Sequence, residues 1–317
     1  MRERMRYRNL TSPCPMFLFL LCASLVQPVV GAPSLFPMTV TDDLGVKIII
    51  PSPPRRIVSL SPGTTEIVYT LGLSDRLVGV TEYCDYPLEV KTKDKVGGYT
   101  NFSVEKVVAL QPDLILAAHG NPIEVIDGIR KLGIPVFGIN PKSLSDVMTI
   151  IERIGRITGV DSTAFRIVSS LRERVTTITN SVSAIPDTER PRVMWGGWDP
   201  PIYTAGPGSF IADLIALAGG KNIAADATTA WPQYSLETIV LKNPEVLIIP
   251  NIPGEDISEG LEHVKRILLG KVGWKIIDAV KHGRIYYIDM QILGRPGPRL
   301  VDGLEQLTTC LYPGRLK

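Results

Sequence analysis

The sequence contains few cysteines. Only four of its 317 residues are cysteines, and two of these lie within the first 32 residues. The other two, Cys84 and Cys310, are far apart in the sequence, and two cysteines do not make a disulfide framework. We interpret both as free thiols, although the sequence alone leaves their pairing open.

Histidines and catalytic motifs are also scarce. The three histidines, His119, His263 and His282, show no metal-ligand spacing. The sequence has no Gly-x-Ser-x-Gly, Walker A or Gly-x-Gly-x-x-Gly motif. These absences argue against an enzyme, a bound metal and a cofactor. Because His119 follows a predicted strand, it either faces a cleft or is an ordinary loop histidine.

Long apolar segments are confined to the N-terminus. Residues 1–32 begin with four arginines and continue into the mostly apolar stretch Met16–Val30, the pattern of a secretory signal peptide. We therefore predict an extracytoplasmic protein with residues 1–32 as its signal peptide. Two alternatives stay open, namely lipidation at Cys22 and retention of the leader as a membrane anchor.

The chain carries little net charge. Its formal net charge is +2, and loss of residues 1–32, with four Arg and one Glu, lowers this by three to −1. The chain after residue 32 has no block of Lys and Arg, so charge does not favour nucleic acid as a partner. We expect the mature chain to be a monomer.

Short apolar stretches alternate with helical patterns along most of the chain. Ile57–Leu60 and Leu114–Ala117 are typical strands, and helices stop near Gly72 and Gly133. This alternation predicts an α/β fold with mostly parallel sheets. A long helix, capped by Asp161, is expected to join two similar lobes. The predicted organisation is a signal peptide (1–32), an N-terminal α/β lobe (33–160), a bridging α-helix (161–185) and a C-terminal α/β lobe (186–317).

An internal repeat supports the two lobes. Residues 99–116 match residues 231–248 at a constant offset of 132, without a gap. Each copy has an aromatic residue, a serine that can cap a helix, a glutamate in the first helical turn, and a proline before an apolar strand. Two equivalent lobes predict a ligand cleft between them.

Aromatic residues make up only 7% of the chain, yet several fall in loops beside predicted strand ends. They are Tyr83, Tyr86, Tyr99, Trp195, Trp198, Tyr203 and Trp231. Flat side chains in loops suit a large flat ligand, because they bury area at little cost in rotamer entropy. The repeat favours Tyr99 and Trp231 for the cleft, whereas Trp195, inside a strand, is expected in the core.

Glu105 and Glu237 form a second matched pair. Stabilisation of a helix N-terminus explains each of them alone. As a pair on two lobes they would also present two carboxylates to arginines of a partner. Both interpretations stay open at this stage.

Four segments carry a family resemblance. They are Ile57–Glu66, Val78–Pro87, Val96–Tyr99 and Val108–Leu116, and they resemble the vitamin B12-binding proteins of ABC importers, BtuF-type, within the helix-bridged (class III) periplasmic binding proteins. The resemblance covers nearly all of the chain after the leader. It implies two rigid α/β lobes, a shallow cleft, capture of cobalamin or a related corrinoid, and delivery to the membrane permease subunits of the importer.

The resemblance also implies roles for individual residues. By motif position, Tyr83, Tyr99 and Trp231 would contact the corrinoid. The loop of residues 200–203, with Tyr203, and the segment before Arg295, with Arg295 itself, would complete the site. Glu105 and Glu237 would dock on the permease. The identity of the corrinoid is left open, since Tyr99 stands where a tryptophan is familiar and Gln291 near where an acidic residue is familiar.

An iron–siderophore or haem-binding protein of the same fold is the alternative. Siderophore binders often hold anionic chelates with cationic side chains, for which Arg295 and Arg299 are the obvious candidates here. An enzyme on a two-lobed scaffold is disfavoured, because no nucleophile–base pair or metal set is present.

Overall fold

Two parallel β-sheets, one from each half of the chain, form the framework of the computed structural model, which describes residues 35–251 and 256–314. The strands are β1 (Met38–Thr41), β2 (Lys47–Ile50), β3 (Ile57–Ser59), β4 (Leu77–Val80), β5 (Asp94–Lys95), β6 (Leu114–Ala118), β7 (Val136–Ile139), β8 (Arg192–Trp195), β9 (Ile202–Tyr203), β10 (Lys221–Asn222), β11 (Gln233–Tyr234), β12 (Val246–Pro250) and β13 (Ile285–Ile288). The α-helices are α1 (Pro62–Thr70), α2 (Val104–Ala109), α3 (Ile123–Lys131), α4 (Leu144–Thr158), α5 (Asp161–Ser183), α6 (Phe210–Leu217), α7 (Leu236–Lys242), α8 (Ile257–Gly270), α9 (Asp278–Lys281), α10 (Met290–Leu293) and α11 (Leu300–Leu311). The predicted signal peptide lies outside the described residues.

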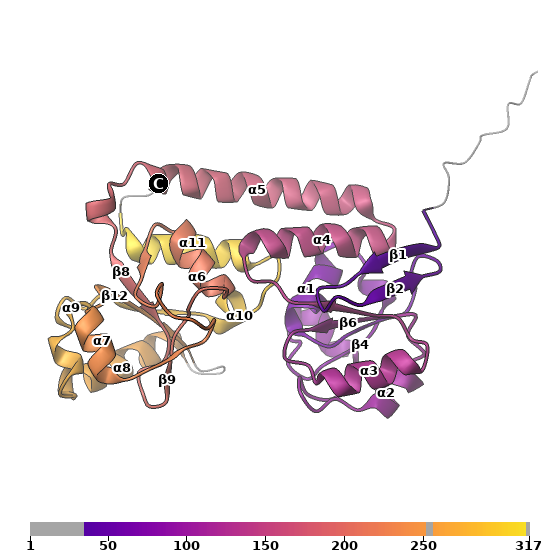
Figure 1. The fold of residues 1–317 in the computed structure, drawn as a ribbon, viewed down its shortest axis with the longest axis horizontal. Coiled ribbons are helices and arrows are strands. Elements are labelled where there is room, and N and C mark those ends of the chain that lie inside the picture. Colours follow the sequence, from indigo (N-terminus) through magenta and orange to yellow (C-terminus); the bar gives the residue numbers. More distant parts are fainter. Residues whose placement is uncertain (1–34, 252–255, 315–317) are drawn as a thin grey trace, which may run out of the picture. The chain divides into compact units, whose positions relative to one another are not determined.

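Both sheets are parallel throughout. The first has the strand order β5-β4-β3-β6-β7 and the second the order β10-β8-β12-β13. Strands β3, β6 and β7 are almost wholly buried, as expected for parallel strands covered on both faces. Strands β1 and β2 form an antiparallel hairpin, and β9 pairs with β11 in the same way. The predicted α/β class with mostly parallel sheets is therefore confirmed (Figure 1).

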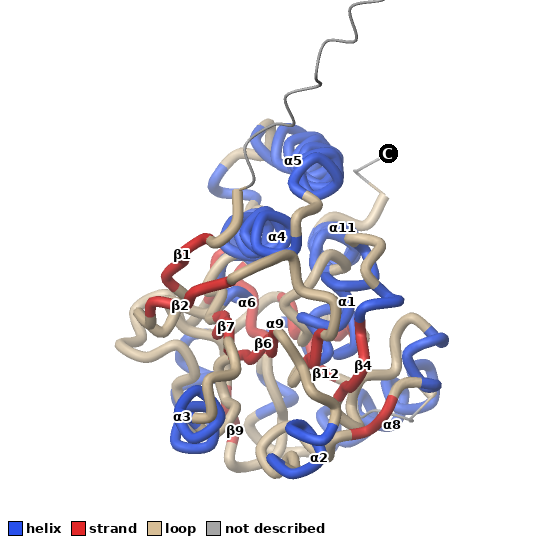
Figure 2. The backbone as a smooth tube through the Cα atoms, turned by 90° about the vertical axis from the view of Figure 1, so that its right-hand side faces the viewer, coloured by secondary structure: helices blue, strands red, loops and turns tan. Residues whose placement is uncertain are grey.

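Helices α4 and α5 connect the two sheets. Gly159 ends α4 with a φ of 76°, a left-handed conformation that glycine adopts without strain, and the chain then enters α5. Helix α5 packs against α4, α6 and α11 (Figure 1), and Figure 2 shows α4 and α5 above the sheet strands β4, β6, β7 and β12. The expectation that Asp161 caps α5 is wrong. Val160 is the N-cap, and Asp161 lies in the first turn, where its negative charge interacts favourably with the helix dipole.

The largest cluster of buried apolar residues continues from one half of the chain into the other. It includes Leu116 of the first sheet together with Val193 and Ile248 of the second, while two smaller clusters each belong to one half. In addition, the backbone N–H of Leu144 at the start of α4 donates to Asp213 of α6 at 2.8 Å. A shared apolar core opposes separation of the halves. The lobe boundaries given above stay predictions.

The sequence repeat has the same local structure in both copies. Ser103 caps α2 and Ser235 caps α7, each hydroxyl accepting a hydrogen bond at 3.2 Å from the N–H three residues further on. After the two helices, Gln111 and Asn243 have positive φ values of 46° and 42°. The offset of 132 therefore corresponds to a repeated helix–turn–strand unit.

Each repeat unit forms similar hydrogen bonds to the start of the neighbouring strand. Asp113 accepts the backbone N–H groups of Arg55 and Arg56 at 2.8 Å, just before β3. Glu245 accepts the backbone N–H of Arg192 at the start of β8, at 2.9 Å. The guanidinium groups of Arg56 and Arg192 donate in return to carbonyls at the ends of α2 and α7. Strands β3 and β8, one in each sheet, thus begin with the same arrangement of a carboxylate and an arginine.

Both cysteines in the described part of the chain are free, as the sequence suggested. Cys84 is buried, and its sulfur lies 3.2 Å from the hydroxyls of Thr65 and Thr81. Burial raises the pKa of the Cys310 thiol to about 11. A thiol that stays protonated at neutral pH is a poor nucleophile, so Cys310 is expected to be unreactive.

Candidate ligand-binding cleft

A cleft made of two adjoining cavities lies between the two sheet-forming halves. The cavities have volumes of about 380 and 420 Å³ and share five wall residues: Tyr99, Ala118, Met290, Gly294 and Pro296. The first cavity is also lined by Ser61, Pro62, Gly63, Tyr83, Gln291 and Arg295. The second is also lined by His119, Asn140, Pro141, Lys142, Trp195, Gly208, Ser209, Phe210, Ile211, Ala230 and Trp231. Because they share these five residues, the two cavities lie side by side.

Sheet topology explains which residues reach the cleft. Ala118 and His119 lie at the carboxyl end of β6, Asn140 follows β7, Trp195 ends β8 and Met290 follows β13. The carboxyl ends of parallel strands lie along one edge of each sheet, which is where ligands of open α/β folds bind. Residues distant in the sequence therefore meet at the cleft.

Tyr99 belongs to both cavities and is held firmly. Its hydroxyl donates to the carbonyl of His119, and its own carbonyl accepts a hydrogen bond from Asn121 at 2.8 Å. Burial raises the pKa of the Tyr99 phenol. The ring is therefore presented as a neutral, fixed aromatic surface rather than as a phenolate.

Trp231 forms an aromatic wall of the second cavity. Its ring lies 5.7 Å from that of Trp195 and 6.2 Å from that of Phe210, measured between ring centroids, and 42% of Trp231 is exposed. Trp195 is half-buried and lines the same cavity, so the expectation that it is purely a core residue needs correction. Its indole N–H is buried and has no hydrogen-bond partner within the described residues. Trp195 therefore supports Trp231 and contributes to the wall itself.

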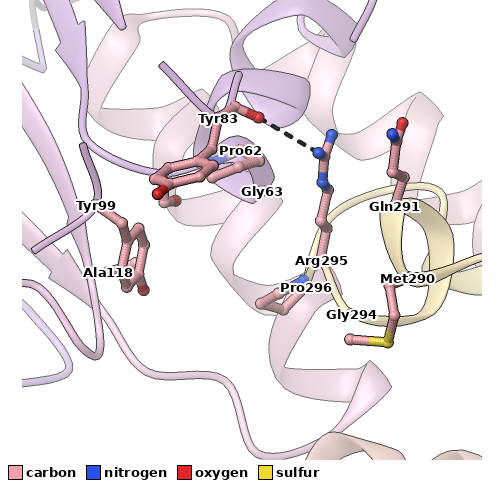
Figure 3. A pocket seen from close by; sticks show the side chains of 11 residues that line it. Pro62, Gly63, Tyr83, Tyr99, Ala118, Met290, Gln291, Gly294, Arg295 and Pro296 are labelled. Carbon is pink, nitrogen blue, oxygen red and sulfur yellow. Dashed lines mark hydrogen bonds between the residues drawn. The ribbon is translucent and has the colours of Figure 1, made fainter. Parts of the chain in front are cut away.

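Arg295 lines the first cavity on the side opposite Tyr99 (Figure 3). Its Nη1 lies 2.5 Å from Oδ1 of Asp85 and 3.7 Å from Oε1 of Glu66, and its Nη2 donates to the carbonyl of Tyr83 at 3.3 Å. Burial alone would raise the pKa of Asp85, but the hydrogen bond and charge of Arg295 outweigh it and lower that pKa. The positive charge of Arg295 is thus already paired.

Arg299 completes a cluster of four charged side chains. It binds Glu66 in a bidentate manner, with Nε 2.9 Å from Oε2 and Nη2 2.6 Å from Oε1, and its guanidinium lies 3.7 Å from the centre of the Tyr86 ring. Glu66 is only 2% exposed. Burial raises the pKa of Glu66, and the bidentate contact with Arg299 opposes this shift. Two carboxylates of the N-terminal half thereby meet two guanidinium groups of the C-terminal half.

The N-terminus of α1 closes one end of the first cavity. Ser61 caps the helix by accepting the N–H of Thr64 at 3.2 Å. A Cβ on Gly63 would lie 2.7 Å from the carbonyl oxygen of Pro296, so only glycine permits this approach of α1 to the opposite wall. This turn has the structure of an ordinary capped helix start.

Two further polar side chains lie on the wall of the second cavity. His119 is exposed, and the nitrogens of its ring have no hydrogen-bond partner among the described residues. Lys142 is also exposed there and forms no ion pair with another described residue. No group of three or more His, Cys, Asp or Glu side chains in the described residues could hold a metal ion.

The predicted site residues divide into three groups. Tyr83, Tyr99, Trp231 and Arg295 line the cleft. Tyr203 does not: it is half exposed in β9 and pairs with Gln233 of β11. Glu105 and Glu237 lie in the first turns of α2 and α7, are exposed, and line neither cavity. Hydrogen bonds from its own backbone N–H and from Ser235 lower the pKa of Glu237.

The sequence did not single out the wall residues Met290, Phe210 and Pro296, although Met290 lies in the segment before Arg295 that the resemblance implied. They have no motif of their own, and apolar residues at such positions resemble core residues. Met290 immediately follows the Asp289 that comes after β13, so a systematic search for residues after parallel strands would have found it.

The fold and the cleft together define a ligand-binding protein built from two α/β halves and connecting helices. Residues 57–292 match a family model described as periplasmic binding protein, and the chain therefore belongs to the periplasmic binding protein family.

Individual relatives agree with this assignment. The chain is 37% identical to the uncharacterized ABC transporter substrate-binding lipoprotein YvrC of Bacillus subtilis (strain 168), over 89% of this chain and 88% of that protein. The crystal structure of the periplasmic vitamin B12-binding protein BtuF of Vibrio cholerae superimposes with a TM-score of 0.71, at 30% identity, covering 82% of this chain and 97% of that one. The periplasmic haem-binding protein RhuT of Roseiflexus sp. RS-1 gives a TM-score of 0.71 at 28% identity, covering 82% and 99%.

The chain is thus an extracytoplasmic substrate-binding protein of an ABC importer. It is a transport protein and not an enzyme, and its ligand is transported cargo rather than a cofactor. Among the described residues, no helix combines the length and apolar character needed to cross a bilayer.

Proposed function

We propose that the cleft captures cobalamin or a closely related corrinoid and that the protein delivers it to the permease of an ABC importer. The observation that carries this proposal is a cleft walled by Tyr83, Tyr99 and Trp231 in which Arg295, the one lining arginine among the described residues, is already paired. Aromatic walls suit the large, flat corrin macrocycle. The likeness to vitamin B12-binding proteins supports the same ligand.

The pairing of Arg295 and Arg299 argues against an anionic siderophore. Both were candidates for a cationic clamp, yet Arg295 contacts Asp85 and Arg299 contacts Glu66. An anionic chelate would have to compete with carboxylates that are already in place. The corrin ring carries neutral amide side chains at its edge, which need hydrogen bonds but no net positive charge.

Haem is the second candidate, and one observation favours it. The ring of His119 lies on the wall of the second cavity without a partner among the described residues, so it is available as an axial ligand. Against haem, the phenol of Tyr99 is hydrogen-bonded to a carbonyl and its pKa is raised by burial, which makes it a poor iron ligand. Among the described residues, the two cavities also offer no pair of unpaired cations for the two haem propionates.

The proposal is tested by offering the purified chain three ligands at equal concentration: cobalamin, haem and a ferric siderophore. After gel filtration, the absorbance spectrum of the protein peak identifies the ligand that co-elutes. We expect the cobalamin spectrum at one molecule per chain. A haem or ferric siderophore spectrum instead would refute the proposed ligand.

Lys142 offers a test of how cobalamin lies in the cleft. Cobalamin carries one phosphodiester in its nucleotide loop, and Lys142 is an unpaired cation on the wall of the second cavity. We expect Lys142→Ala to weaken cobalamin binding by about two- to fivefold, since exposed ion pairs contribute little. Binding of cobinamide, which lacks the loop, should be unchanged.

Calorimetric titration of both ligands measures this difference. Lys131→Ala is the matched control, because Lys131 is an exposed lysine of α3 that lines neither cavity. Equal losses for cobalamin and cobinamide would contradict the assignment of Lys142 to the phosphodiester.

We further propose that Glu105 and Glu237 dock on arginines of the permease. Both are exposed at the starts of repeat-equivalent helices, outside the cleft. Such charges set orientation and association rate more than affinity. In Glu105→Lys/Glu237→Lys, cobalamin affinity should stay near that of the wild type, whereas uptake into vesicles containing the importer should fall at least about tenfold. Normal uptake by the double variant would leave only a role in stabilising the two helices.

We also propose that residues 1–32 direct export, either as a cleaved signal peptide or as a leader lipidated at Cys22, with retention as a membrane anchor as the alternative. A basic start followed by an apolar stretch supports both routes. Mass spectrometry of the mature N-terminus separates them, because lipidation adds acyl chains to Cys22 and plain cleavage leaves a new N-terminus after the leader.

A further inference from the structure

The four-charge cluster beside the cleft has a feature that the proposed ligand alone does not explain. Arg295 lines the first cavity, but neither of its carboxylate partners, Asp85 and Glu66, does. We infer that Asp85 and Glu66 are internal counter-charges that determine ligand specificity. Because they neutralise Arg295, they keep anionic chelates out of the cleft. The site is then left to ligands that carry no net negative charge at that wall. This inference deepens the proposed function and rests on the cleft being the ligand site.

The geometry gives Arg295 little freedom to change partners. Its side chain is 14% exposed, and its Nη1 is held 2.5 Å from Asp85 while Nη2 donates to the carbonyl of Tyr83 (Figure 3). Glu66 stands behind this pair at 3.7 Å and is almost fully buried. A ligand anion arriving from the cavity would meet a guanidinium whose charge is already compensated from behind.

The cluster is balanced only as a whole. Glu66 also binds Arg299 through two hydrogen bonds, so its single charge cannot neutralise both arginines. Asp85 supplies the second negative charge, and within the described residues its ion pair is with Arg295. Removal of the Asp85 charge would therefore leave one uncompensated positive charge, and that charge would be at the cleft wall.

The same arrangement leaves Arg295 able to bind neutral groups. A guanidinium has five N–H donors, and within the described residues Arg295 uses two of them, toward Asp85 and the carbonyl of Tyr83. The remaining donors can reach amide carbonyl groups of a ligand without any gain in net charge. A neutralised arginine is thus suited to the amide-rich edge of a corrin ring and unsuited to a carboxylate or catecholate.

The test uses Asp85→Asn, which keeps the shape of the side chain and removes its charge. Two ferric complexes of similar construction serve as probes: a neutral trishydroxamate and a trianionic triscatecholate. We expect the ratio of triscatecholate to trishydroxamate affinity to rise by about tenfold or more in the variant, because the freed charge lies in a partly desolvated site. This rise in the affinity ratio should be smaller in high salt, as expected for an electrostatic attraction.

Two further variants keep the result interpretable. In Asp85→Asn/Arg295→Gln the gain should disappear, since the guanidinium that produces it is gone. Asp127→Asn is the matched control, because Asp127 pairs with Arg130 on α3, which lines neither cavity, and the affinity ratio should not change. Thermal unfolding of each variant verifies that it is folded.

The possible outcomes are distinct. An unchanged affinity ratio in folded Asp85→Asn would overturn the inference. This includes an equal gain in affinity for both complexes, which would indicate a loosened cleft. A wild-type chain that binds no corrinoid would refute the proposed ligand, yet a charge-dependent gain in Asp85→Asn would still support the role of the counter-charges.

Discussion

Replacing Glu66 by alanine is expected to lower the free energy of unfolding by about 3–5 kcal/mol, the range seen when one partner of a buried ion pair is removed. Glu66 is 2% exposed and accepts two hydrogen bonds from Arg299, with Arg295 close by. Without the carboxylate, two partly buried guanidinium groups share only Asp85. The loss should be visible as a lower urea midpoint with an unchanged slope.

Glu66→Gln separates charge from packing in this prediction. The amide fills the same space and can still accept hydrogen bonds from Arg299, so the variant should be more stable than Glu66→Ala but less stable than the wild type. Asp187→Ala removes a carboxylate from the exposed pair with Lys221 and should leave stability close to that of the wild type. If Glu66→Ala has the same free energy of unfolding as Asp187→Ala, the four-charge cluster does not hold the two halves together.

Replacing Trp231 by alanine is expected to weaken cobalamin binding by about 1–3 kcal/mol, the range for loss of a buried aromatic anchor at an interface. Trp231 lies on the wall of the second cavity and remains 42% exposed without ligand, so it has surface left to bury. Because it lies in a loop and packs mainly on Trp195 and Phe210, stability should change less than affinity.

Tyr99 calls for a different substitution, because its hydroxyl is bonded to the carbonyl of His119 and its ring is packed against Gly120. Tyr99→Ala would remove both the cleft wall and an internal support. Tyr99→Phe keeps the ring and should retain most of the cobalamin affinity. A large loss of affinity in Tyr99→Phe, or unchanged affinity in Trp231→Ala, would show that the aromatic wall does not hold the ligand.

The sequence was sufficient to predict the fold class, because the signals for it are local. Alternating apolar strands and helices, Gly159 at a helix end, and the caps Ser103 and Ser235 act within a few residues. The repeat at an offset of 132 then placed Tyr99 and Trp231 in equivalent positions, and both line the cleft. Asp161 was wrongly predicted as a cap, because aspartate is favoured both at the N-cap and in the first turn and the two positions are adjacent.

The remainder of the site depends on contacts between distant segments. Nothing in the sequence near Arg295 indicates that Asp85, 210 residues away, neutralises it. Trp195 was interpreted as a core residue because a strand position does not reveal whether its end opens onto a cleft. Tyr203 was assigned to the site by motif position, but it lies in β9, pairs with Gln233 of β11 and lines neither cavity. Such relations follow from tertiary packing, which local patterns do not encode.

The central claim, that the cleft is a cobalamin site, is tested most directly by titrating the chain with cobalamin while following tryptophan fluorescence. Trp195 and Trp231 both line the second cavity, so a bound corrinoid, which absorbs in the near ultraviolet, should quench them. The account predicts saturable quenching at one cobalamin per chain with a dissociation constant in the nanomolar to micromolar range, about −8 to −12 kcal/mol. It also predicts that a tenfold excess of haem or of a ferric triscatecholate does not displace the cobalamin. Quenching that fails to saturate, or cobalamin displaced by either competitor at up to a tenfold excess, would contradict the claim.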